Sequence, residues 1–366
     1  MSRRVPISEI KAMLQAEGMS LIMHLCPGGR REGNLWSAPN PTRSADTIGS
    51  FKVWLGGSAH GAWKEYDSDE KGDIIDLIAY VHGSTKVEAI MWARKHLGLE
   101  TADKAQVEER RKEVAYRVAK RNEQELERQA RNQARAFEIF RRAKSANLST
   151  DPAAVAVRAY LASRAIDLDA IGTLEALEVR AAMIEHWSSS EWVAGNKKKA
   201  GYFGPAMVCA IRDAAGIVTG VHCTWLKPDG SGKAPVSNAK LMLGRVQGAV
   251  VRVARGAGNL TVEEAVAAGK AQTTVLTEGI EDAMSIALAV PDARVWAATS
   301  LSNLAWAPVH LACVKAIVVA ADNDWAKPQA MEQLDRATDR LALSGKPLEV
   351  MRPPRNKKDF NDLLRG

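Results

Sequence analysis

Three apolar runs in the last hundred residues each end in acidic or amide side chains, and this pattern limits the possible folds more than any other feature. The runs lie within residues 273–279, 315–324 and 347–362. The polar residues that end them are Glu278, Asp322, Asp324, Asp359, Asn361 and Asp362. A helical segment, IEDAMSIALAV, follows the first run. Alternation of buried strands with helices predicts a parallel α/β sheet, in which the residues after consecutive strands converge on one crevice.

Carboxylates gathered at one sheet edge favour hard divalent cations, so the sequence predicts a Mg²⁺ or Mn²⁺ site rather than a zinc site. Asp322 and Asp324 are one residue apart and can share an ion. Glu278 can complete its shell or act as a general base. Asp359 and Asn361 can hold a second ion or the metal of a bound triphosphate. Two such ions can align and neutralise the oxygens of a phosphoryl transfer.

The order and spacing of these residues resemble the Toprim domain of bacterial-type primases, topoisomerases and some nucleases. Glu278-Gly279 matches the first family motif, Asp322-x-Asp324 the second, and Lys358-Asp359-Phe360-Asn361-Asp362-Leu363 a further acidic motif of primase-type members. The resemblance covers about residues 273–366. It implies a Rossmann-like parallel sheet in which Glu278, Asp322 and Asp324 are catalytic. It also implies that the metal ligands are these three residues together with Asp359 and Asn361.

Each acidic position also has a purely structural interpretation. Glu278 can be a helix-terminus residue stabilised by the helix dipole. Asp322 and Asp324 can be ordinary turn residues. Asp359 and Asp362 can be N-caps of a terminal helix.

The first hundred residues predict a small α+β module with aromatic strands at 34–38, 50–57 and 61–67 and two following helices. This module resembles the zinc-ribbon-like domain at the front of bacterial-type primases. His24, Cys26 and His60 are present, but the family's two later cysteines are absent. A structural zinc site needs four well-placed ligands. We therefore expect a degenerate, metal-free version of that domain.

Charged and aromatic residues interleave in this module, as in proteins that stack single-stranded nucleic acid. The candidates for single-stranded DNA binding are Lys52, Trp54, Trp63, Lys64 and Tyr66. The alternative is that about half of these aromatic side chains replace the lost metal as core.

Residues 103–145 contain no Pro or Gly and are rich in charged helix formers, which predicts a long solvated helix. Its expected role is a spacer, with nucleic-acid binding as the alternative. Residues 149–270 predict mixed α/β structure with a hairpin at 206–212 and 217–226. This region, including Tyr160 to Arg164, resembles the segment before Toprim in phage- and plasmid-type primases.

A set of polar residues is expected to bind the incoming nucleotide or the template phosphates. It consists of Lys227, Lys233, Lys240, Arg245 and Asp282. Asp282 lies one helical turn after Glu278 and can also orient it or join the metal shell. The alternative for the basic residues is an ordinary solvated face.

Composition gives broader limits. The chain has 366 residues, a formal charge of +7 and four cysteines without paired spacing. These values fit a multi-domain α/β protein without a disulfide framework. The expected domains are 1–100, 101–148, 149–270 and 271–366. The start lacks an apolar signal region and no stretch is long enough to span a bilayer, so a cytoplasmic protein without membrane contact is expected.

The three resemblances, to the zinc-ribbon-like domain, to the segment before Toprim and to Toprim itself, together imply a DNA primase of phage or plasmid type, a nucleotidyltransferase that makes short RNA primers. The expected partners are a single-stranded DNA template, ribonucleoside triphosphates and a replicative helicase or other replication protein. Two alternatives remain at this point: a Toprim-type metal-dependent nuclease, and a non-catalytic single-stranded nucleic-acid-binding protein of a mobile element.

Overall fold

The computed structural model divides into two compact units, residues 1–126 and 127–366. It describes residues 5–43, 48–56, 59–102, 104–147, 150–171, 179–193 and 196–366. Three of the sequence predictions include residues outside these ranges. These are residue 57 of the strand expected at 50–57, residue 103 of the expected charged helix, and the domain boundary expected at 148–149. The boundaries between the four expected domains stay predictions. Within the described residues, no helix combines the length and the apolar composition needed to cross a membrane.

The N-terminal unit contains a five-stranded antiparallel sheet in the order β1-β2-β3-β4-β5. Its strands are β1 (Arg30–Glu32), β2 (Leu35–Ala38), β3 (Phe51–Trp54), β4 (Trp63–Glu65) and β5 (Lys71–Gly72). Strands β2, β3 and β4 lie within the three predicted aromatic segments. The alternating burial of β3 and β4 shows that one face of each strand points into the core.

Four helices complete this unit: α1 (Ile7–Glu17), α2 (Met19–Leu25), α3 (Ile74–His82) and α4 (Lys86–His96). Asp73 and Thr85 cap α3 and α4 with capping boxes, which satisfy the first free backbone N–H groups of each helix. Apolar residues of α1, α2 and α3 pack with Phe51 and Trp63 in one buried core. The predicted α+β module is therefore present.

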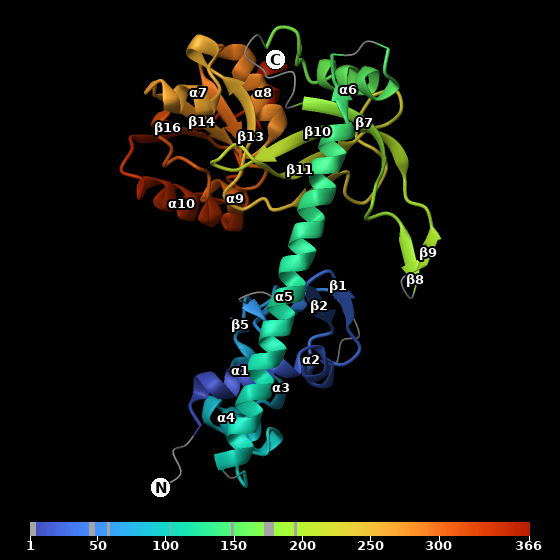
Figure 1. Cartoon of the computed structure of the whole chain (residues 1–366), viewed down its shortest axis with the longest axis vertical. Helices are drawn as coiled ribbons and strands as arrows, with labels where there is room; N and C mark the ends of the chain where they lie inside the picture. The colour runs from blue at the N-terminus through green and yellow to red at the C-terminus, as the bar shows by residue number, and fades with distance from the viewer. Residues whose placement is uncertain are drawn as a thin grey trace. The chain divides into compact units, whose positions relative to one another are not determined.

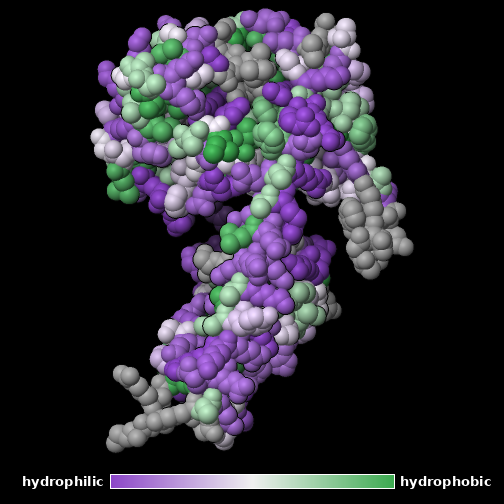
Figure 2. Space-filling model, in the orientation of Figure 1, coloured by the Kyte–Doolittle hydropathy of each residue, from purple (hydrophilic) through white to green (hydrophobic). Residues whose placement is uncertain are grey.

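Helix α5 (Lys104–Arg142) is continuous and belongs to both units (Figure 1). Val107 and Val114 pack against the N-terminal core, whereas Ala136 and Phe140 are buried in a core of the C-terminal unit. The rest of its surface is mainly hydrophilic in the view of Figure 2. The charged segment is thus a helix, as its composition predicted, with apolar contacts near its two ends.

The C-terminal unit begins with a five-stranded antiparallel sheet in the order β12-β11-β10-β7-β6. Its strands are β6 (Lys144–Ser145), β7 (Val179–Glu185), β10 (Phe203–Arg212), β11 (Val218–Trp225) and β12 (Lys240–Gly244). Helix α6 (Pro152–Ala162) contacts β7 and β10, and a short hairpin of β8 (Glu191–Val193) and β9 (Asn196–Lys199) forms separately. The predicted hairpin corresponds to β10 and β11.

A second five-stranded sheet follows, in the order β13-β15-β14-β16-β17. Its strands are β13 (Val251–Arg255), β14 (Gln272–Thr277), β15 (Arg294–Ala297), β16 (Val314–Ala320) and β17 (Leu348–Met351). Pairing is parallel throughout except at β13, which runs antiparallel to β15. Strands β14, β16 and β17 are neighbours, so the residues after them meet at one edge.

Helices cover both faces of this sheet. They are α7 (Val262–Ala267), α8 (Ile280–Ala289), α9 (Leu301–Leu304), α10 (Pro328–Ala342) and α11 (Phe360–Leu364), with a 3-10 turn at Ala257–Asn259. Val275 packs with α8 on one face, and the next residue, Leu276, packs with α9 and α10 on the other. Figure 1 shows α8 and α10 on opposite sides of the strands. The predicted multi-domain α/β class and parallel C-terminal sheet are confirmed, with β13 as an antiparallel edge.

Candidate metal and nucleotide site

Three aspartates converge at the carboxyl edge of the C-terminal sheet. Asp322 follows β16, Asp282 lies in the first turn of α8, and Asp359 is the N-cap of α11. One carboxylate oxygen from each lies within 4.8 Å of the others. Among the described residues, no other group of three or more His, Cys, Asp or Glu side chains has this spacing. The donor set consists of hard oxygens and fits a divalent cation such as Mg²⁺ or Mn²⁺.

Steric crowding explains why the second residue of the Glu278-Gly279 motif is a glycine. A Cβ atom at position 279 would lie 2.7 Å from Oδ2 of Asp282, closer than carbon and oxygen can approach without a shift. Gly279 is also the N-cap of α8, so the backbone turns there while Asp282 folds back toward the strand end. The small residue therefore lets the Asp282 carboxylate reach the edge of the sheet.

Asn361 is held at the same edge by its own hydrogen bonds. Its backbone N–H donates to Oδ1 of Asp282 at 2.9 Å, and its side-chain Nδ2 donates to Ser285 Oγ at 3.0 Å and to the carbonyl of Arg164 at 2.9 Å. Its Oδ1 accepts from Arg164 Nη1 at 3.3 Å. The residue is only 2% exposed. In this structure, its contacts fix Asp282 and tie α11 to α8 and to the end of α6.

Burial and mutual repulsion make these carboxyl groups hard to ionise together. Burial, and then the charge of Asp322, raise the pKa of Asp282 to about 7. Burial, followed by the charges of Glu278 and Asp359, raise the pKa of Asp322 to about 6. Crowded, desolvated carboxylates of this kind require protons or a cation to balance their charge.

Glu278 and Asp324 lie beside this cluster. Both line a smaller hollow with Asp322 and Arg352. Burial and the charge of Asp324 raise the pKa of Glu278 above its usual value. Asp324 itself forms an ion pair with Lys327 at 2.7 Å. The structure thus brings the predicted residues Glu278, Asp322, Asp324, Asp359 and Asn361 to one sheet edge, with Asp282 among them.

Basic residues line the same pocket as the acidic residues, and this pocket has a volume of about 270 Å³. The basic residues are Lys233, Lys240, Lys358 and Arg164. Burial, and then the nearby charge of Lys240, lower the pKa of Lys233. A pocket wall that carries both charges suits a ligand that carries both phosphates and a metal ion.

Lys240 is held in this wall by a buried partner that sequence reasoning missed. Its Nζ pairs with Oε2 of Glu281 at 2.9 Å, while the hydroxyl of Tyr160 donates to Oε1 at 2.9 Å. Burial alone would raise the pKa of Glu281, but the Lys240 charge and these hydrogen bonds lower it to about 2. Glu281 is 6% exposed. A carboxylate in a helical segment gives no such signal in the sequence, because its partners lie 41 and 121 residues away.

Two further residues of the pocket were also missed. Thr299, after β15, has a φ of 69°, in the left-handed region that a β-branched residue rarely adopts. Strained backbone of this kind gathers at functional sites. His222 of β11 is buried, and burial followed by the charge of Lys240 lowers its pKa to about 4, so the ring is neutral.

Two residues of the predicted nucleotide-binding set lie elsewhere. Lys227 is exposed in the turn after β11 and is not part of the pocket wall. Arg245 follows β12 and pairs with Asp213 at 2.9 Å. Lys233, Lys240 and Asp282 are the members of that set that the structure brings to the acidic edge.

The predicted single-strand-binding residues of the N-terminal unit divide by burial. Trp63 is 4% exposed and stacks with Phe51 at a ring separation of 5.3 Å, so it is part of the core. Tyr66 is 45% exposed, with Lys64 5.1 Å from its ring centre. Lys52 pairs with Glu32 at 3.5 Å, and Trp54 is half-buried at the end of β3.

The residues that remain from the family's zinc site, His24, Cys26 and His60, lie in the same unit. Cys26 is buried, and burial raises the pKa of its thiol to about 12. His60 is also buried, and its pKa is lowered by burial.

The chain is similar to several solved primase structures at low sequence identity. The zinc-binding and RNA polymerase domains of the Aquifex aeolicus primase share 15% identity, with a TM-score of 0.41, over 98% of this chain and 81% of that one. A DNA primase domain from Pseudomonas aeruginosa shares 14% identity, with a TM-score of 0.44, over 64% and 74% of the two chains. The E. coli primase catalytic core shares 14% identity, with a TM-score of 0.44, over 63% and 74%. No curated protein matches the chain.

Two domain families match the sequence. A domain of unknown function, DUF7146, matches residues 130–253, which include the end of α5 and the antiparallel sheet of the C-terminal unit. The Toprim domain matches residues 273–366, which hold every acidic residue of the cluster. The predicted resemblance to Toprim is therefore confirmed: residues 273–366 match the Toprim domain model.

Proposed function

We propose that this protein is a DNA primase, a nucleotidyltransferase that makes short RNA primers on single-stranded DNA. One observation carries the proposal: the Asp282, Asp322 and Asp359 carboxylates, which lie within the Toprim match, line one pocket together with Lys233 and Lys240 from the preceding region. Polymerisation of nucleoside triphosphates needs acidic residues that would hold divalent cations and basic residues that bind the phosphates.

Divalent cations fit the acidic cluster, because its buried carboxylates repel one another and have raised pKa values. When bound, these ions would neutralise charge that develops on the transferred phosphoryl group. Asp282, Asp322 and Asp359 would hold them, with Asp324 and Glu278 completing the ligand shell. Asn361 would keep Asp282 in place through its backbone N–H.

The remaining steps belong to the protein's own side chains. Glu278 has a raised pKa and lies beside Asp322, so it is suited to take the proton of the attacking ribose hydroxyl. Lys240, fixed by Glu281, and Lys233 would hold the triphosphate by charge-assisted hydrogen bonds. Arg164 and Lys358 would add to this binding from the same wall.

The partners proposed for this reaction are a single-stranded DNA template, ribonucleoside triphosphates and a replicative helicase or other replication protein. The phage or plasmid type and a cytoplasmic location are proposed with it. In the N-terminal unit, exposed Tyr66 with Lys64, and half-buried Trp54 with Lys52, would contact the template.

Primer synthesis can be tested directly with the purified full-length chain, single-stranded DNA, labelled ribonucleotides and Mn²⁺ or Mg²⁺. The expected result is labelled oligonucleotides that ribonuclease degrades and that the Asp322→Asn variant does not make. Shortened DNA without labelled RNA would replace the proposal with a nuclease. Retention of DNA without either product would replace it with a binding protein.

A further inference from the structure

A second pocket lies at the opposite end of the Toprim sheet from the acidic cluster. It has a volume of about 220 Å³ and is lined by Arg212, Arg252, Arg255 and Arg294, among other residues. Arg294 begins β15 and pairs in register with Arg255, the last residue of β13. Strand β15 runs parallel to β14, so Arg294 marks the amino end of these strands, whereas the acidic residues follow their carboxyl ends.

Four guanidinium groups around one pocket create a strongly positive site. Among the described residues, Glu263 is the one carboxylate in the wall, and its Oε1 pairs with Arg252 Nη1 at 2.6 Å. The wall thus carries four guanidinium groups and one carboxylate. Guanidinium groups keep their charge when buried and bind phosphate oxygens in pairs.

Two of these arginines have buried N–H groups that the protein leaves unused. Arg294 is 1% exposed; its Nε and Nη2 donate to the carbonyls of Arg255 and Leu260, both at 3.2 Å, but its Nη1 has no partner. Arg252 donates through Nη2 to the carbonyl of Asp213 at 3.0 Å, but its Nε has no partner. Buried donors without an acceptor are costly, and the two side chains that carry these donors both line the pocket.

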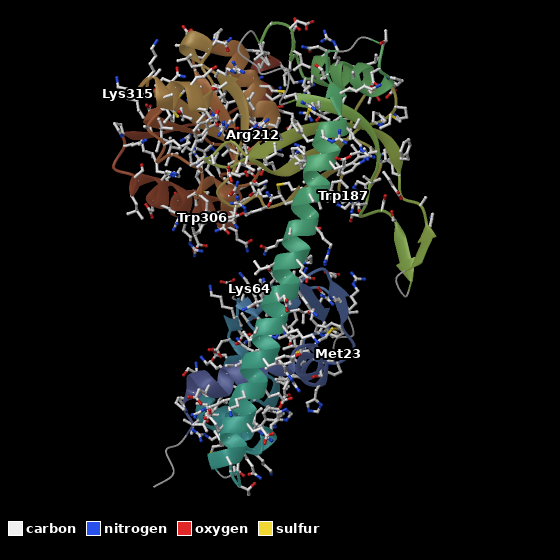
Figure 3. All side chains as sticks on the ribbon, in the orientation of Figure 1. Met23, Lys64, Trp187, Arg212, Trp306 and Lys315 are labelled. Carbon is white, nitrogen blue, oxygen red and sulfur yellow. The ribbon has the colours of Figure 1, made fainter. Side chains whose placement is uncertain are left out.

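The rest of the wall limits the size of any bound anion. Arg212, labelled in Figure 3, donates through Nη1 to the carbonyl of Gly216 at 2.8 Å, which fixes its guanidinium. Buried Trp296 and Val253 contribute apolar surface. The pocket has a volume of about 220 Å³, which accommodates a compact anion.

We propose that this arginine pocket is an anion site that binds inorganic phosphate or pyrophosphate, separate from the metal and nucleotide site. Arg294 and Arg252 supply the unused donors, and Glu263 competes with the anion for Arg252. A nucleic-acid phosphate has the same chemistry. We assign the pocket to the small anion, because the pocket is small and lies at the end of the sheet opposite the acidic cluster.

Calorimetric titration of the full-length chain with pyrophosphate and with phosphate tests this site. The titration is carried out in EDTA at fixed ionic strength, so it requires neither a divalent metal nor primer synthesis. The expected result is saturable binding at one site per chain. Arg252→Gln should weaken it at least tenfold, whereas Glu263→Gln should strengthen it several-fold, because the competing carboxylate is removed. Arg336→Gln is the matched control: this arginine is exposed on α10 and pairs with Glu332, outside the pocket.

Three results would overturn the assignment. Equal weakening by Arg252→Gln and Arg336→Gln would mean that only overall charge matters. Loss of binding in Lys233→Gln, with Arg252→Gln unaffected, would place the anion in the metal and nucleotide pocket. Competitive displacement by single-stranded oligothymidylate would assign the arginines to a nucleic-acid backbone. Melting temperatures of all variants, measured without ligand, show whether each one is folded, and unchanged binding in well-folded Arg252→Gln would also reject the site.

Discussion

The backbone N–H of Asn361 donates to the carboxylate of Asp282 at 2.9 Å, across 79 residues of sequence. Through this bond the last helix of the structure orients a carboxylate on α8, and the neighbouring N-cap Asp359 enters the same cluster. One helix N-terminus therefore supplies both a candidate metal ligand and the hydrogen bond that positions another. The structural interpretation of Asp359 as an N-cap and its interpretation as a ligand are compatible.

Asp322→Asn should abolish primer synthesis while leaving the fold intact. Loss of one anionic ligand should reduce the rate at least about a thousandfold, which corresponds to roughly 4 kcal/mol of transition-state stabilisation. Asp324→Asn and Glu278→Gln should have similar effects. Incorporation of labelled ribonucleotides at saturating Mg²⁺ measures them. Asp335→Asn, which changes an exposed carboxylate on α10, is the matched control and should keep full activity. Substantial synthesis by folded Asp322→Asn would contradict the catalytic role.

In the absence of metal, the C-terminal unit should lose stability as pH rises from 5 to 8. The pKa of Asp282 in the folded state is about 7, above its unfolded value, so the folded protein holds this proton more tightly. The contribution is fully present below the unfolded pKa of ~3.9 and is lost as pH rises through about 7. Asp322, with a folded pKa of about 6, acts in the same direction.

Thermal unfolding in EDTA at several pH values measures this effect, and Asp282→Asn provides the comparison. The amide can still accept the Asn361 hydrogen bond but cannot ionise, so this variant should be more stable than the wild type at pH 8. About 1 kcal/mol would raise the melting temperature by ~2–4 °C. Saturating Mg²⁺ should stabilise the wild type more at pH 8 than at pH 5. A variant that is no more stable than the wild type at pH 8 would show that Asp282 is not strained by its charge.

Glu281→Gln should weaken nucleotide binding more than it slows the chemical step. The variant keeps an acceptor for Tyr160 but loses the charge that fixes Lys240. We expect a rise in KM for ribonucleotides of roughly tenfold, with a smaller change in kcat, and a loss of about 1–3 kcal/mol in stability. Steady-state kinetics would separate these effects. Tyr160→Phe, which keeps the ion pair, should change KM less. An unchanged KM in Glu281→Gln would remove Lys240 from triphosphate binding.

In the N-terminal unit, Trp63→Ala should lower stability, whereas Tyr66→Ala should weaken DNA binding. Trp63 is buried, so its removal should cost about 3–5 kcal/mol in stability. Tyr66 is exposed, so its removal should leave stability nearly unchanged but weaken single-stranded DNA binding by ~1–3 kcal/mol. Denaturant unfolding and fluorescence anisotropy measure the two quantities. Equal DNA affinity in Tyr66→Ala and the wild type would count against a stacking role.

The purified protein should contain no stoichiometric zinc. The chain has His24, Cys26 and His60 but lacks the two later cysteines expected of a primase zinc site. Burial also raises the pKa of the Cys26 thiol to about 12. A cysteine that binds zinc does so as the thiolate, and burial of Cys26 disfavours that form. Elemental analysis that finds about one zinc per chain, lost in Cys26→Ala, would refute the metal-free prediction.

The acidic edge of the sheet could be predicted because it depends only on residues that are close together in the sequence. A carboxylate directly after an apolar run lies at a strand end, and parallel strands bring their ends together, so Glu278, Asp322 and Asp324 needed no tertiary information. Strand β15 was not predicted. It has only four residues, and its place beside β14 depends on pairing with β13, far back in the sequence.

Residues whose roles depend on distant partners could not be found in the same way. Glu281 appears in the sequence as one more polar residue of a helix, and only the packing of α6 and β12 makes it a buried partner of Tyr160 and Lys240. Arg245 belongs to a basic stretch, but its side chain pairs with Asp213 instead. The basic stretch predicted Lys227, Lys233, Lys240 and Arg245 for nucleotide or template binding, and of these only Lys233 and Lys240 line the pocket with the acidic residues.

Helix α11 has only five residues, yet the acidic cluster depends on its docking against α8. A helix this short has little stability by itself. If α11 opens locally, Asp359 leaves the cluster and Asp282 loses its hydrogen-bond donor at once. A bound cation would resist that opening, so ion binding and the docking of α11 are thermodynamically linked. The exchange rates of the α11 backbone amides with deuterated solvent would then report on ion occupancy without any substrate present.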